Sequence, residues 1–249
     1  MGNDFFVTGT DTGIGKTVFT ALAVAFAAGK GKSGVMKPVQ TGCVERKEGL
    51  IAPDLQFVRR ACGDIFAEKA LDLMAPVRLK MPASPHLAAA KEGKEIEIKT
   101  IIQAYRELSG RFDNLFIEGA GGLLVPITED YLMVDLMREL DLPVILVSRS
   151  GLGTINHTLL SLEVLESRGL NIAGVVFNDS HPKTRGVIEK DNSRIIKKIS
   201  GCPLLGRIPH IPELDDMVAN PGNIWEQLED VNDLQNLKKS LENLIVNAG

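Results

Sequence analysis

The chain has 249 residues, of which 44% are hydrophobic and 24% are charged, and its formal net charge is −4 at pH 7. This composition is that of a globular protein with a sizeable core, and it excludes an intrinsically disordered chain. No block of Lys or Arg accompanies the slightly acidic balance, so we expect small-molecule ligands rather than a nucleic acid or a membrane surface. No Ser-, Gly- or Pro-rich linker divides the sequence, and we predict a single domain over residues 1–249.

The cysteines, the histidines and the first residues exclude several other classes. The three cysteines are odd in number and far apart, and the four histidines lack metal-binding spacing, so we predict free thiols and no zinc site. The opening residues, MGNDFF, have neither the basic nor the apolar region of a signal peptide. The longest apolar stretch, at 20–29, has about half the length needed to cross a bilayer. We therefore expect a cytoplasmic protein.

Along the chain, short apolar runs alternate with longer segments of helical pattern. The strands are apolar throughout, as expected of strands that are buried on both faces. This alternation predicts an α/β fold with one doubly wound, mostly parallel sheet, whose ligands bind beyond the carboxyl ends of the strands. The predicted strands are 5–9, 33–39, 114–119, 143–148 and 171–178, and the predicted helices lie near 17–29, 98–110, 131–140 and 154–168.

The first strand runs into a glycine-rich loop within VTGTDTGIGKT, residues 7–17. The usual phosphate-loop spacing, G-x-x-x-x-G-K-[ST], misses by one residue, because the upstream glycine is Gly9. The strand–loop–helix order is nevertheless that of a phosphate-binding loop, so we predict phosphate-loop NTPase topology. The alternative is a glycine-rich turn followed by an exposed lysine and a capping threonine.

In such a loop each residue type has a physical task. Backbone amides at the start of the helix would surround the phosphates of a nucleotide. Lys16 would neutralise the phosphate oxygens, and the hydroxyl of Thr17 would reach Mg²⁺. The predicted nucleotide-binding residues of the loop are Thr12, Gly13, Ile14, Gly15, Lys16 and Thr17.

The second strand ends in KPVQTG, residues 37–42, which places a second lysine, Lys37, and the hydroxyl of Thr41 at the carboxyl edge of the sheet. Pro38 has no amide hydrogen for a strand ladder, which favours an end of the strand at this point. A lysine there either reaches solvent or belongs to a site. Asp54, in APDLQFVRRA, is likewise either a site residue or the N-cap of a helix.

The third strand ends in LFIEGAGG, residues 115–122. Glu118 follows an apolar run and precedes a chain segment that is too rich in glycine to block a ligand. An acidic residue in this place is typical of the Mg²⁺ ligand in nucleotide hydrolases. The alternative is a surface glutamate before a turn.

Taken together, these motifs resemble the dethiobiotin synthetase family over most of the chain. Each segment alone is common, but their combination, in the family's order and spacing, is specific. The segments are FVTGTDTGIGKT (6–17), KPVQTG (37–42), ASPHLAA (83–89), EGAGGLLVP (118–126), LPVILVSRSGLGTINHTLL (142–160), AGVVFND (173–179) and LLGRIP (204–209).

The resemblance implies an ATP-dependent ring closure. In that reaction 7,8-diaminononanoate captures CO₂ as a carbamate, ATP phosphorylates the carbamate, and the neighbouring amine displaces phosphate to form a cyclic urea. Because a carbamate anion must approach a triphosphate, positive charge has to screen oxygen from oxygen. Lys16, Lys37 and Thr41 would carry this chemistry. Thr17, Asp54 and Glu118 would bind Mg²⁺, with water and phosphate oxygens completing its octahedron.

The resemblance also implies binding roles for later segments and a homodimer with the substrate near its interface. GLGTIN, residues 151–156, opens a helix whose free amides suit the carboxylate tail of the substrate; Asn156 is either its side-chain contact or an ordinary first-turn asparagine. Asn178 has the donor and acceptor that match the edge of adenine. Pro209 and Glu213 would cover the base and the ribose. The implied substrate contacts are Lys37, Thr41, Glu118, Gly121, Gly153 and Asn156.

The sequence departs from the family's pattern in two places, and two alternative functions are open. Gly13 lies where some relatives carry an acidic residue, and the chain after about residue 183 resembles the family only loosely. One alternative is a partitioning-type ATPase switch, but such proteins carry a signature lysine near the position of Asp11. The other is an amidoligase of the cobyric acid type, but the chain is too short for the glutamine-hydrolysing domain of that enzyme.

Overall fold

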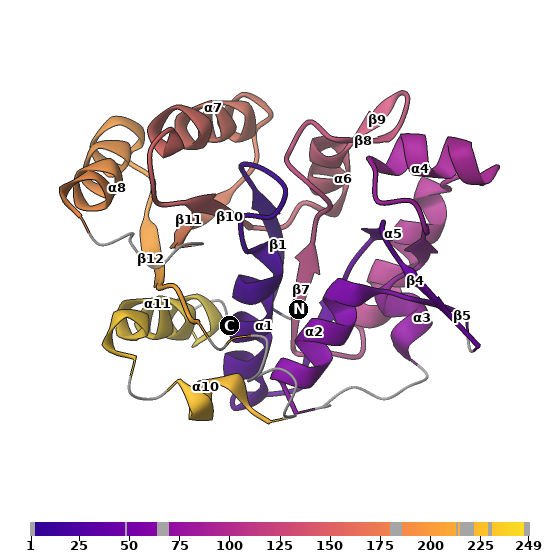
Figure 1. Ribbon diagram of the computed structural model, residues 1–249, viewed down its shortest axis with the longest axis horizontal. Helices are drawn as coiled ribbons and strands as arrows, with labels where there is room; N and C mark the ends of the chain where they lie inside the picture. The colour runs from indigo at the N-terminus through magenta and orange to yellow at the C-terminus, as the bar shows by residue number, and fades with distance from the viewer. Residues whose placement is uncertain are drawn as a thin grey trace.

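A computed structural model describes residues 3–47, 49–63, 70–179, 186–212, 214, 222–228 and 231–246 (Figure 1). Its central element is a six-stranded sheet with the order β12-β11-β10-β1-β7-β2, in which every neighbouring pair is parallel. The strands are β1 (Asn3–Gly9), β2 (Ser33–Met36), β7 (Asn114–Glu118), β10 (Val144–Arg149), β11 (Ile172–Asn178) and β12 (Leu204–Ile208).

The strand order explains where a ligand is expected. From β1 the chain passes outward to β2, returns to β7, and then continues on the other side of β1 through β10, β11 and β12. The order therefore reverses beside β1, and ligands of doubly wound sheets bind at such a switch point, at the carboxyl ends of the strands. The loop that joins β1 to the first helix is located there.

Helices surround the sheet (Figure 1). Helix α1 packs against β1, β2 and β7, and α11 packs against β12. None of the helices within the described ranges is long and apolar enough to span a lipid bilayer. The helical elements are α1 (Lys16–Ala28), α2 (Pro53–Ala61), α3 (Leu71–Met74), α4 (Pro85–Glu92), α5 (Ile98–Ser109), α6 (Met133–Leu140), α7 (Thr154–Ser167), α8 (Val187–Ser200), α10 (Ile224–Gln227), the 3-10 turn η2 (Asn232–Leu234) and α11 (Gln235–Val246).

Three short strand pairs lie outside the central sheet. A parallel pair joins β3 (Val39–Gln40) to β6 (Val77–Arg78). The other two pairs are antiparallel and join β4 (Val44–Arg46) to β5 (Gly49–Ile51), and β8 (Pro126–Thr128) to β9 (Tyr131–Leu132). Strand β3 follows directly from β2, with only Lys37 and Pro38 between them.

The core consists of the apolar strands and the helix faces that cover them. Phe6 on β1, Phe116 and Ile117 on β7 and Phe19 on α1 are fully buried. Burying such a side chain contributes about 1.5–3 kcal/mol relative to leaving it exposed, so this core fixes the strands whose ends carry the site. The two ends of the described chain also meet, since the side chain of Asn3 donates to the carbonyl of Ile245 at 2.7 Å (Figure 1).

The predicted α/β fold with a doubly wound parallel sheet is confirmed, with two corrections of detail. The predicted strand 33–39 ends at Met36, and the chain resumes as β3 in a separate pair, because Pro38 cannot donate to a ladder. The predicted helix 131–140 begins at Met133, since residues 131–132 form β9. Strand β12 and helices α2, α4, α8 and α11 were not predicted.

Candidate active site

The parallel register brings three strand ends together at the carboxyl edge of the sheet. In adjacent strands, Met36 of β2 pairs with Ile117 of β7, and Val7 of β1 pairs with Glu118. Lys37, one residue beyond Met36, therefore lies beside Glu118, the last residue of β7. The glycine-rich loop leaves β1 at the same edge. The sheet thus places a lysine, a glutamate and a phosphate-type loop at one point.

The loop between β1 and α1 depends on its glycines. Gly15 has φ +95°, a left-handed conformation that favours glycine, and it is the N-cap of α1. A Cβ on Gly15 would lie 2.1 Å from Nδ2 of Asn178, which itself donates to the carbonyl of Ile14 at 2.9 Å. Only a glycine at this position lets the end of β11 approach the loop so closely.

Lys16 is the first residue of α1, and it points inward. Its side chain is almost completely buried, and Nζ donates to the carbonyl oxygen of Asp11 at 2.8 Å. Burial, together with the positive charge of Lys37, lowers the pKa of Lys16 to about 8. Thr17 does not cap the helix, because its hydroxyl donates to Oε1 of Glu118 at 2.8 Å. The alternative of an exposed lysine and a capping threonine is therefore wrong.

Lys37 bridges two carboxylates inside the protein. Its Nζ lies 2.6 Å from Oδ2 of Asp54 and 2.7 Å from Oε1 of Glu118. Glu118 is 1% exposed and Lys37 is 5% exposed, so neither is the surface residue that the alternatives described. Asp54 lies in the first turn of α2, whose N-cap is Ala52, so the alternative of a capping aspartate is also wrong.

This arrangement settles the charge of Lys37. Burial alone lowers the pKa of an ammonium group, but the negative charges of Glu118 and Asp54, and their hydrogen bonds, outweigh burial and raise the pKa of Lys37 above its usual value. Lys37 is therefore a fixed positive charge. Removing it would leave two carboxylates facing one another without their counter-ion, which is costly in a buried site.

A cavity of about 450 Å³ connects these groups. The loop, both lysines, both carboxylates and the segment after β7 contribute to its wall. Ten of the twelve residues that line it were predicted from the sequence, and the other two, Gln40 and Ala120, were not. The lining residues are Thr12, Gly13, Gly15, Lys16, Thr17, Lys37, Gln40, Thr41, Asp54, Glu118, Ala120 and Gly121.

The oxygen atoms in this cavity form a set that suits a hard divalent cation. Thr17 and Lys37 both donate to the same Oε1 of Glu118, and Lys37 joins that atom to Asp54. Among the described residues, no group of three or more His, Cys, Asp or Glu side chains could hold a metal ion. Two carboxylates and one hydroxyl fit a cation that takes its remaining ligands from phosphates and water, as Mg²⁺ does.

A second cavity, of about 300 Å³, lies on the other side of the same loop. Gly13 and Gly15 line both cavities, and Asn178 and Pro209 line the second one. Asn178 is the last residue of β11, and Pro209 follows β12. Glu213, which was predicted to act beside Pro209, lies outside the described residues. The phosphate-type loop therefore separates a charged cavity from one bounded by strand ends and a proline-rich segment.

Helix α7 begins one residue after Gly153, as the sequence analysis predicted for GLGTIN. Gly153 is the N-cap, with φ +88°, and Asn156 lies exposed in the first turn. Neither residue lines the two cavities described above. Leu152 and Leu160, at the start and in the middle of this region, are 88% and 58% exposed. The structure thus places Gly153 and Asn156 at the surface, in a helix start that also exposes Leu152, rather than in either cavity.

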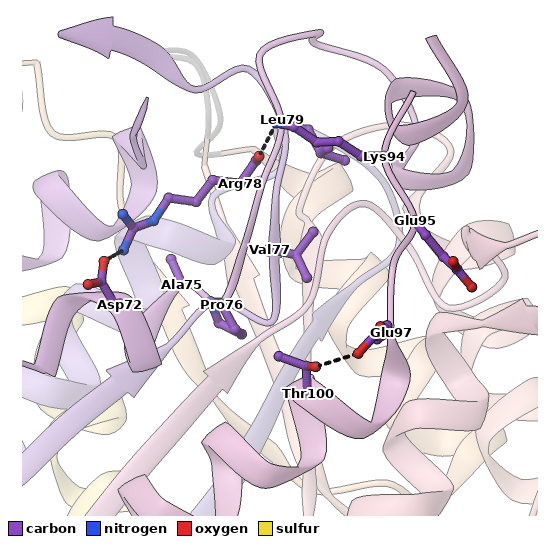
Figure 2. Close-up of a pocket in the computed structure, with 10 residues that line it drawn as sticks. All are labelled: Asp72, Ala75, Pro76, Val77, Arg78, Leu79, Lys94, Glu95, Glu97 and Thr100. Atoms are coloured by element: carbon purple, nitrogen blue, oxygen red, sulfur yellow. Dashed lines mark hydrogen bonds and ion pairs between the residues drawn. The ribbon is translucent and has the colours of Figure 1, made fainter. Parts of the chain in front are cut away.

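A third cavity, of about 530 Å³, lies beside β6 (Figure 2). Several of its polar groups are engaged: Arg78 pairs with Asp72 at 3.0 Å, Lys94 donates to the carbonyl of Arg78 at 3.2 Å, and Thr100 donates to Glu97 at 3.1 Å. No residue of this cavity was predicted to be functional. Its polar groups stabilise the connection between β6 and α5.

Comparison with known proteins shows the family to which the chain is similar. The profile of a family described as an AAA domain matches residues 3–218. An ATP-dependent dethiobiotin synthetase from Thermodesulfovibrio yellowstonii is 38% identical over 223 residues, which cover 86% of this chain and 92% of that protein. The protein of the same name from Methanococcus vannielii is 43% identical over 202 residues, covering 81% of this chain and 90% of that protein.

The solved structures that resemble this one show the fold. The septum site-determining protein MinD from Pyrococcus horikoshii, in complex with Mg-ADP, superposes with a TM-score of 0.60 at 18% identity, covering 100% of this chain and 98% of that chain. The MinC:MinD complex from Aquifex aeolicus gives a TM-score of 0.61 at 17% identity, covering 98% of this chain and 95% of that chain. At such low identity, the likeness extends to the arrangement of strands and helices.

Proposed function

The chain belongs to the family of ATP-dependent dethiobiotin synthetases, and on that premise we propose how its residues carry out the reaction. It is a ligase of biotin biosynthesis that forms dethiobiotin with the use of ATP. The substrates are 7,8-diaminononanoate, CO₂ and ATP, and the products are dethiobiotin, ADP and phosphate. The observation that carries this proposal is the second buried lysine, Lys37, held between Asp54 and Glu118 beside the phosphate-type loop.

The reaction has two bond-forming steps after CO₂ capture. One amine of the substrate binds CO₂ and becomes a carbamate. A carbamate oxygen attacks the γ-phosphorus of ATP, ADP leaves, and a carbamic-phosphoric anhydride forms. The second amine then attacks the carbonyl carbon, phosphate leaves, the nitrogen loses its proton and the cyclic urea closes. Both steps need reacting atoms to be held in line, and the first needs two anions to meet.

The residues of the charged cavity fit these needs. The amides of residues 12–15 and the ammonium of Lys16 would bind the phosphates of ATP, and Lys37 would screen the carbamate from the γ-phosphate. Thr41, half-buried in the same wall, would bond the transferring group. Thr17, Asp54 and Glu118 would hold Mg²⁺, which supplies further neutralisation of the phosphate charge when bound. Glu118 and Gly121 would also border the diamine.

The cavity on the other side of the loop suits the base of the nucleotide. Asn178 offers an amide acceptor and a remaining amide hydrogen, the pair of groups that matches the edge of adenine. Pro209 would cover the face of the base. The proposed role of Glu213 at the ribose rests on the sequence alone.

Replacing Asn178 with leucine should relax or abolish the preference for ATP over other nucleoside triphosphates without removing phosphate affinity, because the phosphates would bind to loop amides and Lys16 rather than to Asn178. Competition among ATP, GTP, CTP and UTP in the synthesis assay measures this. Inorganic triphosphate, which has no base, serves as the control ligand, because its affinity reports any change in the loop that follows from losing the bond between Asn178 and the carbonyl of Ile14. An unchanged order of the four nucleotides would show that Asn178 does not read the base.

The apolar surface around the start of α7 supports a homodimer with the substrate near its interface. Leu152, Leu160 and Leu124 are large apolar side chains that are more than half exposed. The free amides at the N-terminus of α7, next to Gly153 and Asn156, suit the carboxylate tail of a substrate that extends from one protomer toward the other. This arrangement would explain why these two residues lie outside the cavities of a single chain.

The alternative function, a partitioning-type ATPase switch, is supported by the fold alone. The position at which those proteins carry a signature lysine is occupied by Asp11, whose carboxylate pairs with Arg149 at 2.8 Å. An experiment with ¹³C-labelled bicarbonate tests the proposed synthesis directly. We expect the label in the urea carbonyl of dethiobiotin, and one phosphate per product. Label absent from the product would contradict the proposal.

A further inference from the structure

Gln40 has an unsatisfied acceptor in the wall of the active-site cavity. Its side chain is 5% exposed, and it lines the same 450 Å³ cavity as Lys37 and Thr41. Nε2 donates to the carbonyl of Thr41 at 3.0 Å, whereas Oε1 has no hydrogen-bond partner among the described residues. Most buried polar atoms in folded proteins have a partner, so an exception in a cavity wall calls for an explanation.

Hydrogen bonds to the backbone of Gln40 fix the position of this residue. The carbonyl oxygen of Gln40 accepts from the amide of Leu79 at 2.9 Å and from Sγ of Cys43 at 3.5 Å. These contacts tie β3 to β6, which in turn lines the cavity of Figure 2, where Arg78 and Lys94 are already engaged. Because the bond from Nε2 to Thr41 assigns the two ends of the amide, the unpaired atom is the carbonyl oxygen.

The chemistry of the reactants identifies the missing donor. The reacting oxygens of ATP and of the carbamate are anionic and only accept hydrogen bonds, whereas the carbamate nitrogen keeps one N–H that can donate. The carboxylate tail of the substrate is also an acceptor. The amine that closes the ring carries N–H groups, and it must come close to Lys37 and Thr41, because the carbamate that it attacks is formed there. Of the two donors at the reacting end, the amine is the one whose orientation matters for ring closure, because its lone pair must point at the carbonyl carbon.

We propose that Gln40 is a substrate-contacting residue whose Oε1 accepts a hydrogen bond from the ring-closing amine of the diamine; this inference rests on the proposed function. A neutral acceptor is suited to this task. A carboxylate in the same place would favour the protonated ammonium, which has no lone pair for attack. The amide oxygen orients an N–H and leaves the nitrogen lone pair free to form the C–N bond as phosphate leaves.

The test compares three variants in the synthesis assay. Gln40→Met keeps the volume and removes the acceptor, Gln40→Glu keeps an acceptor and adds a charge, and both lose the bond from Nε2 to the carbonyl of Thr41, so a loss seen in Gln40→Met alone reports the acceptor. Gln103→Met, on the exposed face of α5, is the matched control. For Gln40→Met we expect KM for the diamine to rise by about tenfold or more, as for a lost hydrogen bond to a buried acceptor. The Kd of Mg·ADP should change by less than about twofold, because the nucleotide does not use this acceptor.

Two further readouts separate substrate contact from a structural role. Analogues that lack one amine, 7-aminononanoate and 8-aminononanoate, are used as competitive ligands. The parent should bind one of them more weakly than the diamine, and Gln40→Met should lose that difference. Gln40→Glu, the closest in shape, should move the pH optimum of kcat to higher pH, because its charge keeps the amine protonated until the solution is more alkaline.

Two results would overturn the inference. One is an unchanged KM for the diamine in Gln40→Met, and the other is an equal loss of diamine and nucleotide affinity, which indicates a structural role. If Gln40→Met fails to fold, an unshifted pH optimum in Gln40→Glu overturns it instead. A parent enzyme that makes no dethiobiotin would refute the proposed function, whereas a parent that makes it while these variants behave normally would refute the role of Gln40 alone.

Discussion

Replacing Lys37 with glutamine should slow ring closure by about a hundredfold or more while Mg·ATP binds nearly as it does to the parent. Lys37 would lie between the carbamate and the γ-phosphate. These two anions approach each other in a closed site, where water screens their repulsion poorly. Removing one preorganised electrostatic contact of this kind costs about 10²–10³ in rate. Glutamine keeps most of the length and the hydrogen bonding of the side chain, so the loss measures the charge.

The structure explains why nucleotide affinity should survive this change. In the protein without ligand, Lys37 is the counter-ion of Asp54 and Glu118, at 2.6 and 2.7 Å. Without the ammonium, these carboxylates repel one another, and a bound divalent cation would relieve that repulsion. Thermal unfolding of Lys37→Gln should therefore shift upward on addition of Mg²⁺ by more than that of the parent.

Two measurements are needed for Lys37→Gln. Isothermal titration with a non-hydrolysable ATP analogue reports binding, and the product assay with diaminononanoate and bicarbonate reports ring closure. Lys80→Gln, which removes an exposed lysine paired with Glu45, controls for the loss of one positive charge. Dethiobiotin formation close to the parent rate would show that Lys37 is not the partner of the carbamate.

Replacing Lys16 with alanine should remove most turnover and also weaken ATP binding, because this lysine meets the phosphates in the ground state as well as during transfer. We expect a loss of about a hundredfold or more in kcat/KM. The fold should remain intact, since the Nζ of Lys16 contacts only the loop carbonyl of Asp11 in the described hydrogen bonds. Circular dichroism and thermal unfolding provide that control. Normal turnover with normal ATP affinity would defeat the assignment of Lys16.

The contrast between the two lysines is itself informative. Both are buried, but burial lowers the pKa of Lys16 to about 8, whereas Asp54 and Glu118 keep the pKa of Lys37 raised. Lys16 would thus form its ion pairs with the phosphates when ATP binds. Lys37 already forms ion pairs with Asp54 and Glu118 in the protein without ligand. We therefore expect Lys16→Ala to affect both KM for ATP and kcat, and Lys37→Gln to affect chiefly kcat.

Five strands of the central sheet were predictable because they are continuous apolar runs. Such runs are typical of strands that are buried on both faces of a parallel sheet. Strand β12 escaped prediction because its five residues, Leu204–Ile208, include Gly206 and Arg207 and are only partly apolar. Helices α2 and α8 have mainly polar sequences with narrow apolar faces. Their helical state depends on packing against neighbouring elements, which local sequence does not reveal.

The residues that line the charged cavity were predictable where a residue type coincided with a strand end, as for Lys37 and Glu118, or with the start of the helix after the glycine-rich loop, as for Lys16. The sequence pattern could not show which of the site residues form ion pairs in the folded protein. Asp54 lies on a helix, and only the packing of α2 against α1 and β2 brings its carboxylate to Lys37. Gln40 was missed because a glutamine in a short apolar run carries no distinctive spacing. Its position after the Lys37–Pro38 break was the available signal, since that break turns the chain into the cavity wall.

The most direct test of the central claim is the dependence of ATP consumption on both other substrates. Phosphate release and dethiobiotin are measured together, with diaminononanoate and bicarbonate each supplied or withheld. We predict that phosphate appears only when both are present, and in a one-to-one ratio with dethiobiotin, because the γ-phosphate leaves through ring closure. Equal phosphate release without the diamine would contradict this account and favour a simple ATPase of the same fold.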